Sequence, residues 1–113
     1  MASENPISEL EKRVHFAEKC GQTWAEVHEK WLMLEKDEKP YLAALMNDLK
    51  GDMSEAARER LARGSKEFRE YILGLCIAKG EELRAKVKYD NAVAWYEAGR
   101  SLEATERAKT RMF

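Results

Sequence analysis

The stretch WAEVHEKWLML, residues 24–34, decides the fold because its large apolar side chains recur at helical spacing. They stand at positions i, i+3, i+7 and i+10, which share one face of an α-helix. The residues in these positions are Trp24, Val27, Trp31 and Leu34. No alternation of apolar and polar residues, the pattern of a half-buried strand, competes with this spacing. The stretch therefore predicts an amphipathic helix with one packed stripe.

This stripe extends in both directions as a heptad repeat. One phase holds Ile7, Val14, Gly21, His28, Leu42 and Leu49, and the other holds Leu10, Ala17, Trp24, Trp31 and Leu45. The repeat meets charged residues at Glu35 and Glu38, just before Pro40. A proline inside a straight helix costs about 3 kcal/mol, because it lacks an N–H and its ring clashes with the preceding turn. We therefore expect a first helical arm over about residues 6–50, opened at Asn5-Pro6, with a kink or short break near Pro40.

Turn residues separate this arm from a second one. In LKGDMSEAA, residues 49–57, Gly51 suits the end of a helix. Asp52 followed by Glu55, or alternatively Ser54, suits the start of the next helix. The second arm is expected over about residues 53–113, with a further break near Gly64-Ser65 or Lys79-Gly80. Its packing residues are predicted to be Leu61, Phe68, Ile72, Leu75, Leu83, Tyr89, Val93 and Tyr96.

A heptad repeat of this length favours antiparallel helices that wind around each other. The sequence predicts a single all-α domain over residues 1–113, a long antiparallel helical hairpin or small bundle with coiled-coil character. A chain of 113 residues buries a modest share of its surface, so we expect self-association, most simply as a homodimer, to complete the core. A compact monomeric bundle of three or four helices is the alternative. The expected interface residues are Trp24, Trp31, Leu42, Leu45, Tyr89 and Tyr96.

The sequence offers no arrangement of residues suited to catalysis. His15 and His28 stand on helix faces about 220° apart. His28 lies between two tryptophans on the packed stripe, where a satisfied core or boundary histidine is expected. No His-Glu-x-x-His, Glu-x-x-His or Gly-x-Ser-x-Gly pattern occurs. The glycines are dispersed through the predicted helices and do not gather into a phosphate-binding loop. A non-enzymatic protein with no catalytic residue, metal or cofactor is predicted.

The cysteines and the start of the chain bear on the cellular compartment. Cys20 and Cys76 stand alone, without a Cys-x-x-Cys pair, and MASENPISEL does not resemble a secretory signal. Both thiols are expected to be buried and reduced in a cytoplasm. YILGLCIA, residues 71–78, is expected in the core, where apolar surroundings would make the Cys76 thiol inert. No apolar run approaches the roughly 20 residues of a membrane span, so no membrane partner is expected.

Charge is divided unevenly along the chain. Residues 1–57 carry seven Lys/Arg against twelve Asp/Glu, and residues 58–113 carry thirteen against nine. Near the end, the apolar stripe of Tyr89, Val93 and Tyr96 continues on the same helix face as a row of arginines. Cations at a helix C-terminus stabilise the helix dipole, and this accounts for them without any ligand. The alternative is contact with phosphate or an acidic surface, through Arg100, Arg107, Lys109 and Arg111.

The closing stretch VKYDNAVAWYEAGRSLEATERAKTRM, residues 87–112, resembles the last helix of small uncharacterised helical proteins from bacteriophage and prophage genes. The resemblance implies a bacterial host cytoplasm and an accessory role, with a host or phage protein as partner. It transfers no functional residues. A second hypothesis is a nucleic-acid-binding accessory of phage recombination or replication that uses the basic C-terminal helix.

Overall fold

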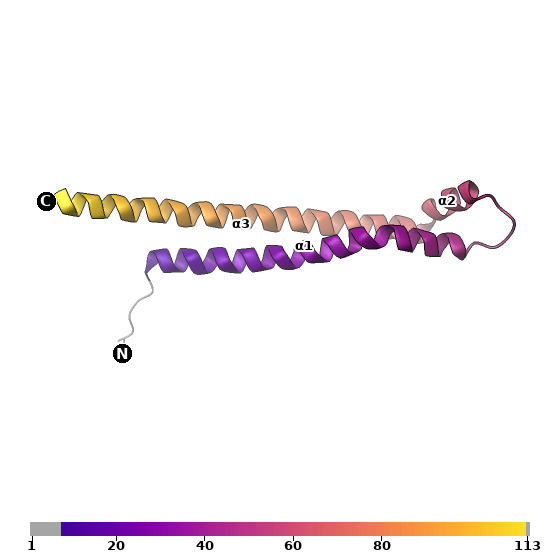
Figure 1. Ribbon diagram of the computed structural model, residues 1–113, viewed down its shortest axis with the longest axis horizontal. Helices are drawn as coiled ribbons and strands as arrows, with labels where there is room; N and C mark the ends of the chain where they lie inside the picture. The colour runs from indigo at the N-terminus through magenta and orange to yellow at the C-terminus, as the bar shows by residue number, and fades with distance from the viewer. Residues whose placement is uncertain (1–7, 113) are drawn as a thin grey trace, which may run out of the picture. The chain divides into compact units, whose positions relative to one another are not determined.

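The described part of the chain, residues 8–112 of a computed structural model, is entirely helical apart from short connections (Figure 1). It consists of three helices, α1 (Glu9–Asn47), α2 (Glu55–Arg63) and α3 (Lys66–Met112). The predicted all-α class is confirmed. The chain divides into two compact units, which we call unit 1 (Met1–Ala25 with Leu83–Phe113) and unit 2 (Glu26–Glu82).

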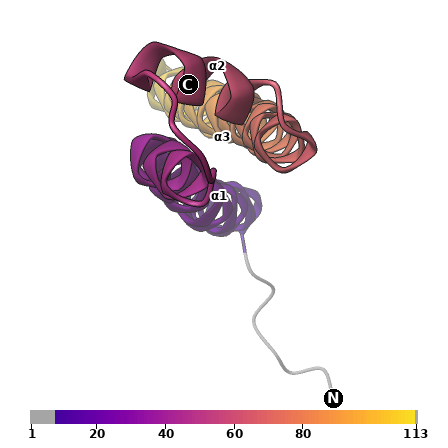
Figure 2. The same ribbon diagram turned by 90° about the vertical axis from the view of Figure 1, so that its right-hand side faces the viewer.

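In each unit a segment of α1 lies beside a segment of α3 and runs in the opposite direction (Figures 1 and 2). In unit 1, Trp24 stacks on Tyr89 with ring centroids 5.8 Å apart and planes inclined by 12°. In unit 2, the rings of Tyr41 and Tyr71 meet edge to face at 4.8 Å. The antiparallel pairing of long helices that the heptad predicted is therefore present in both units.

The first helix begins at Glu9, later than predicted. Ser8 precedes it, and its Oγ accepts a hydrogen bond of 3.1 Å from the amide of Glu11. This Ser-x-x-Glu pattern is a capping box, which satisfies one of the amides that the first turn of a helix leaves without a partner. Asn5, Pro6 and Ile7, to which the sequence assigned the start of the arm, lie outside the described residues.

The first helix continues through Pro40 without interruption, so a break at this proline is excluded. The heptad repeat changes phase before this proline. After Trp31, the next inward-facing side chain is Leu34, three residues later, in place of Glu35, four residues later. Trp31 and Leu34 are both half-buried, whereas Glu35 is exposed. A three-residue step of this kind lets a heptad stripe pass a charged position while the helix stays intact.

Two residues determine the connection from α1 to α2. The sequence predicted Gly51 at the helix end, and it offered Ser54 as the alternative to Asp52 for the helix start. Gly51 adopts φ of 103°, a left-handed conformation that suits glycine at a helix end. Ser54 caps α2 by accepting a 3.1 Å hydrogen bond from the amide of Ala57, so Ser54 and not Asp52 is the cap.

An arginine that the sequence analysis did not single out holds this connection. The guanidinium of Arg58 donates to the carbonyl oxygens of Met46, Leu49 and Gly51 at 3.3, 2.6 and 2.8 Å. These carbonyls belong to the end of α1 and the turn beyond it, where a helix leaves its last acceptors without intrahelical donors. Arg58 therefore closes α1 with a charged donor, a contact that a pattern of apolar spacing cannot reveal.

The second break falls at Gly64-Ser65, one of the two predicted places, and α3 passes through Lys79-Gly80 uninterrupted. The hydroxyl of Ser65 donates to the carbonyl of Ala62 at 2.6 Å and accepts from the amide of Phe68 at 3.2 Å. This serine thus ends one helix and starts the next.

The core of unit 2 gathers where α2 and the start of α3 meet the end of α1. Its buried members are Leu42, Ala62 and Phe68, with 7, 2 and 4% of their surface exposed. Four half-buried side chains pack against them: Leu45, Met46, Leu49 and Ile72.

Beside this core the phenol of Tyr71 donates to the carbonyl of Leu34. Burial, with the nearby carboxylates of Asp37 and Glu38, raises the pKa of Tyr71 above its ordinary value.

Unit 1 packs through small residues on both helices. Cys20 and Ala92 are buried, with 5 and 3% of their surface exposed. A Cβ atom at Gly21 would lie 2.9 Å from Cε1 of Tyr89, which shows how closely that ring covers the glycine. A Cβ at Gly99 would lie 3.0 Å from Cδ of Arg13. A larger residue at either position would force the neighbouring side chain to move, so glycine fits the observed packing best.

Several predicted packing residues face outward instead. Leu61 and Leu83 are 54 and 50% exposed. Within YILGLCIA, Leu73 and Ile77 are 61 and 53% exposed, and Cys76 is exposed as well, so the prediction that this thiol is buried is wrong. The reason is geometric: the segment is helical, and a helix paired with one neighbour buries one stripe and leaves the opposite face open.

Candidate interaction surfaces

The predicted interface residues of unit 1 pack within the chain. Trp24 and Tyr89 are half-buried and stack on each other. Tyr96 is half-buried and lies on the inward face of α3, seven residues after Tyr89. These side chains hold α1 and α3 together in unit 1, and a role for them between two copies stays a prediction.

The same holds for the predicted interface residues of unit 2. Leu42 belongs to the buried core and Leu45 packs against it. Trp31 is half-buried, and the ammonium of Lys79 lies 3.8 Å from the centroid of its ring. Together they account for the packing of α1 against α2 and α3 in unit 2.

A buried carboxylate lies between the helices of unit 2. Glu82 has 4% of its surface exposed, and its Oε1 lies 3.1 Å from Nζ of Lys79 and 3.5 Å from Nδ1 of His28. His28 in turn has its ring 5.6 Å from that of Trp31. A buried carboxylate is tolerated where a cation offsets the loss of hydration, and the ammonium of Lys79 does so here, with the His28 ring beside it.

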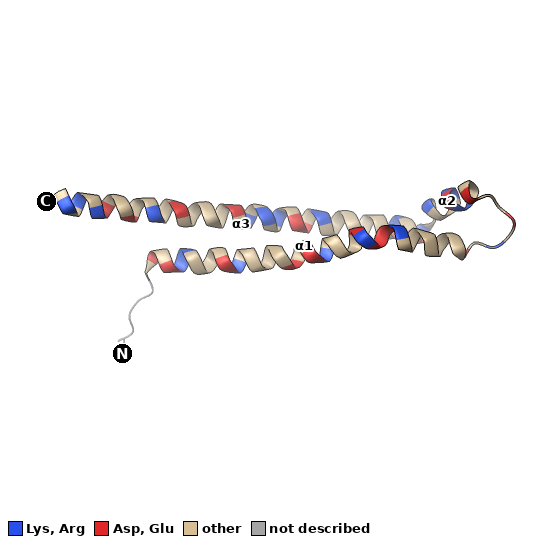
Figure 3. Ribbon diagram, in the orientation of Figure 1, with Lys and Arg blue, Asp and Glu red and all other residues tan. Residues whose placement is uncertain are grey.

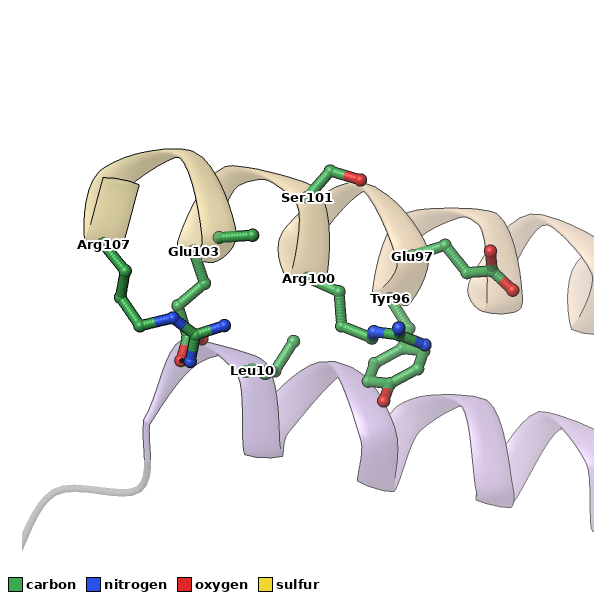
Figure 4. A pocket seen from close by; sticks show the side chains of 8 residues that line it. Leu10, Tyr96, Glu97, Arg100, Ser101, Glu103 and Arg107 are labelled. Atoms are coloured by element: carbon green, nitrogen blue, oxygen red, sulfur yellow. Dashed lines mark ion pairs between the residues drawn. The ribbon is translucent and has the colours of Figure 1, made fainter. Parts of the chain in front are cut away.

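The cationic end of α3 forms a groove in unit 1 together with the first turn of α1 (Figure 4). The groove has a volume of about 440 Å³ and is lined by Leu10 of α1 and by seven residues of α3, Tyr96, Glu97, Arg100, Ser101, Glu103, Ala104 and Arg107. The guanidinium carbon of Arg100 lies 6.0 Å from the centroid of the Tyr96 ring, and Nη1 of Arg107 lies 3.9 Å from Oε1 of Glu103. Two guanidinium groups beside one apolar side chain can bind a phosphate or carboxylate.

The structure brings together two of the four predicted anion contacts and separates the others from them. Arg100 and Arg107 line the groove, whereas Lys109 and Arg111 do not. Residues 101–112 are all exposed. Glu97 and Glu103 line the same groove, and acidic residues are interspersed with basic ones along this end of α3 (Figure 3), so the local positive potential is reduced.

Most aromatic side chains already have a cation of the chain over or beside the ring. The pairs, with their distances to the ring centroid, are Lys79–Trp31 at 3.8 Å, Arg13–Trp95 at 4.6 Å, Arg63–Phe68 at 5.8 Å, Lys86–Trp24 and Lys88–Phe16 at 5.9 Å, and Arg100–Tyr96 at 6.0 Å. Cation–π contacts of this kind stabilise the packing. The interleaved aromatic and basic residues of the sequence therefore serve the fold first, since a base-stacking platform requires open aromatic faces.

Arg13 is a second positioning residue that sequence reasoning missed. Its side chain is 15% exposed, and its Nη1 donates to the carbonyl of Trp95 at 2.8 Å while its Nε lies 3.3 Å from Oε1 of Glu9. Two sequence features could have indicated this role. Arg13 is a cation directly beside the apolar heptad positions of α1, and Gly99 on α3 has no side chain and so leaves space for the arginine.

Comparisons with protein-family models, with curated proteins and with solved structures found no match. Across residues 8–112, no helix combines the length and the apolar character needed to cross a membrane. The same residues contain no group of three or more His, Cys, Asp or Glu that could hold a metal ion.

Proposed function

We propose that this chain is a non-enzymatic accessory protein of the bacteriophage type, which self-associates and acts by binding other proteins through its long amphipathic helices. The attribution to a bacteriophage and a bacterial cytoplasm rests on the resemblance of residues 87–112. The mode of action rests on the helix surfaces.

The observation that carries the proposal is the set of large apolar side chains on outward helix faces. In unit 2, Met33, Leu73 and Ile77 are 61, 61 and 53% exposed. In unit 1, Val87 and Leu102 are 59 and 61% exposed. Of these, Leu73 and Ile77 stand four residues apart on one face of α3. Neighbouring exposed apolar side chains of this kind are typical of protein-binding surfaces.

Self-association is tested by mass. We expect multi-angle light scattering at micromolar concentration to give a mass close to twice the 13.1 kDa of one chain. A mass of one chain across the accessible concentration range would contradict self-association. Affinity capture from phage-infected bacteria, with the purified chain as bait, then tests for a host or phage partner.

The arginine groove favours a second candidate, binding of nucleic acid in phage recombination or replication. Phosphate contacts release counterions, so each one makes affinity fall more steeply with salt. If the groove and the basic residues beyond it on α3 bind DNA, replacing Arg100 and Arg107 of the groove and Arg111 beyond it by alanine should weaken binding to unrelated sequences alike. The slope of log affinity against log salt should become shallower by up to about three units.

Fluorescence titration of duplex and single strands at two salt concentrations measures this effect. Circular dichroism should show an unchanged fold, because exposed charges contribute little to stability. No binding by the unaltered chain at low salt would exclude the nucleic-acid function.

A further inference from the structure

A groove in unit 1 combines an apolar floor with two cations on its border. It has a volume of about 350 Å³, and its floor is formed by Phe16 of α1 and by Val87 and Trp95 of α3. Phe16 and Trp95 meet edge to face at 5.9 Å and are each 42% exposed. Arg84 and Lys88 also line this groove. Arg13 and Lys88 each lie near one of these rings, but both rings remain partly accessible, and partly accessible aromatic side chains in a groove are typical anchors of protein interfaces.

The two border cations are available to an acidic partner. Among residues 8–112, neither Arg84 nor Lys88 forms an ion pair, whereas Lys86 on a different face pairs with Asp90 at 3.2 Å. Nζ of Lys88 lies 5.9 Å from the centroid of the Phe16 ring, beside the apolar floor. The groove therefore fits a helix that carries apolar side chains with an acidic residue at one end of them.

Unit 2 presents a helix face with this pattern. On α3, Leu73 and Ile77 stand four residues apart and are exposed by 61 and 53%. Glu70, three residues before Leu73, and Glu81, four residues after Ile77, lie on the same face of the helix. Both carboxylates are exposed. Glu70 is 3.9 Å from Lys66, an exposed pair of the kind that contributes little and can be exchanged for a stronger contact.

We propose that two copies of this chain associate by docking the Glu70–Leu73–Ile77–Glu81 face of unit 2 of one copy into the groove of unit 1 of the other. The apolar side chains of the face cover Phe16, Val87 and Trp95, and the carboxylate at one end of the face approaches Arg84 and Lys88, which stand one helical turn apart. This proposal rests on the proposed self-association and adds the surface that produces it.

Charge reversal on either side tests this pairing. One variant carries Arg84→Glu and Lys88→Glu, and the other carries Glu70→Lys and Glu81→Lys. In each variant alone the groove and the face have the same sign of charge, and like charges placed together across an interface are strongly unfavourable. We expect the dissociation constant of each variant to rise at least about 100-fold. An equimolar mixture should form a dimer, because each groove then meets a face of opposite charge.

The mass of each variant and of the mixture is measured by light scattering, and the mixed dimer is identified by mass spectrometry. A variant with Lys36→Glu and Lys39→Glu serves as a matched control for the groove variant: both lysines are exposed on α1, and the change in net charge equals that of Arg84→Glu with Lys88→Glu. It should remain dimeric.

The outcomes separate this inference from the proposed function. Dimeric variants, or monomeric variants whose mixture stays monomeric, would overturn the pairing of face and groove and leave self-association intact. A monomeric unaltered chain would overturn both. If the groove bound a different acidic protein and never a second copy of this chain, the inference would also be contradicted.

Discussion

Replacing Phe68 by alanine is expected to lower the free energy of unfolding by about 3–5 kcal/mol, the range for a large aromatic side chain removed from a core. Phe68 is 4% exposed and packs with Leu42 and Ala62. Its ring also lies 6.4 Å from that of Tyr71, nearly parallel at 15°. The substitution leaves a cavity at the point where α2 and the start of α3 meet α1, because the helical backbones on its three sides cannot all move inward. Urea unfolding followed by circular dichroism measures the change.

Met33→Ala is the matched control for this experiment. Met33 also belongs to a helix of unit 2 and is of comparable size, but it is 61% exposed. Its removal should change the free energy of unfolding by no more than about 0.5 kcal/mol. Both variants are compared with the unaltered chain at one protein concentration, so that association affects them equally. If Phe68→Ala and Met33→Ala lowered the free energy of unfolding equally, the core around Phe68 would not be what stabilises the fold.

Replacing Lys79 by methionine should cost about 3 kcal/mol, the lower end of the range for removing one partner of a buried ion pair. The lower end applies because the Lys79 side chain is 40% exposed while that of Glu82 is 5% exposed. Methionine keeps the length and apolar stem of lysine but removes the ammonium that lies 3.1 Å from Glu82 and 3.8 Å from the Trp31 ring. The carboxylate then has less compensation for its lost hydration.

Lys86→Met provides the control, because Lys86 also forms an ion pair on α3 and lies 5.9 Å from a tryptophan ring, that of Trp24. Its pair with Asp90 is exposed on both sides, so a loss of at most about 1 kcal/mol is expected. Adding Glu82→Leu to Lys79→Met should restore the stability, since a buried apolar side chain needs no counter-charge. A cost for Lys79→Met no larger than that of Lys86→Met, or a failed rescue, would refute the assigned role of Glu82.

The heptad pattern predicted the helices and their antiparallel pairing because both depend on one repeated stripe. On α3 the inward positions follow at intervals of seven residues, at Phe68, Leu75, Glu82, Tyr89 and Tyr96. One of these is a glutamate, and a pattern based on apolar residues passes over it. Its burial depends on Lys79 of its own helix and on His28 of α1, and a neighbour on another helix cannot be identified from spacing along one helix.

The predictions of which apolar side chains are buried were less successful, because burial depends on the neighbouring helix. Leu61, Leu83 and Cys76 follow helical spacing, but spacing does not state which of two apolar stripes faces the partner helix. The arginine groove was partly predicted: the helical wheel placed Arg100 and Arg107 together, and the structure brings Leu10 of α1 to both. The contribution of Arg13 and Arg58 could not be predicted, because each donates to main-chain carbonyls whose positions depend on the tertiary structure.

The two glycines of unit 1 also determine the axial alignment of its helices. A heptad repeat is degenerate under translation: sliding α1 by seven residues along α3 would still match apolar positions with apolar positions. Such a slide would bring Val14 beneath the ring of Tyr89, where even a Cβ on Gly21 would come within 2.9 Å. The same slide would move Arg13 from Gly99 to Ala92, whose methyl group would occupy the space that the guanidinium stem needs. Gly21 and Gly99 thus make the slipped alignment less favourable from both helices, and they favour the observed register in a sequence pattern that would tolerate several.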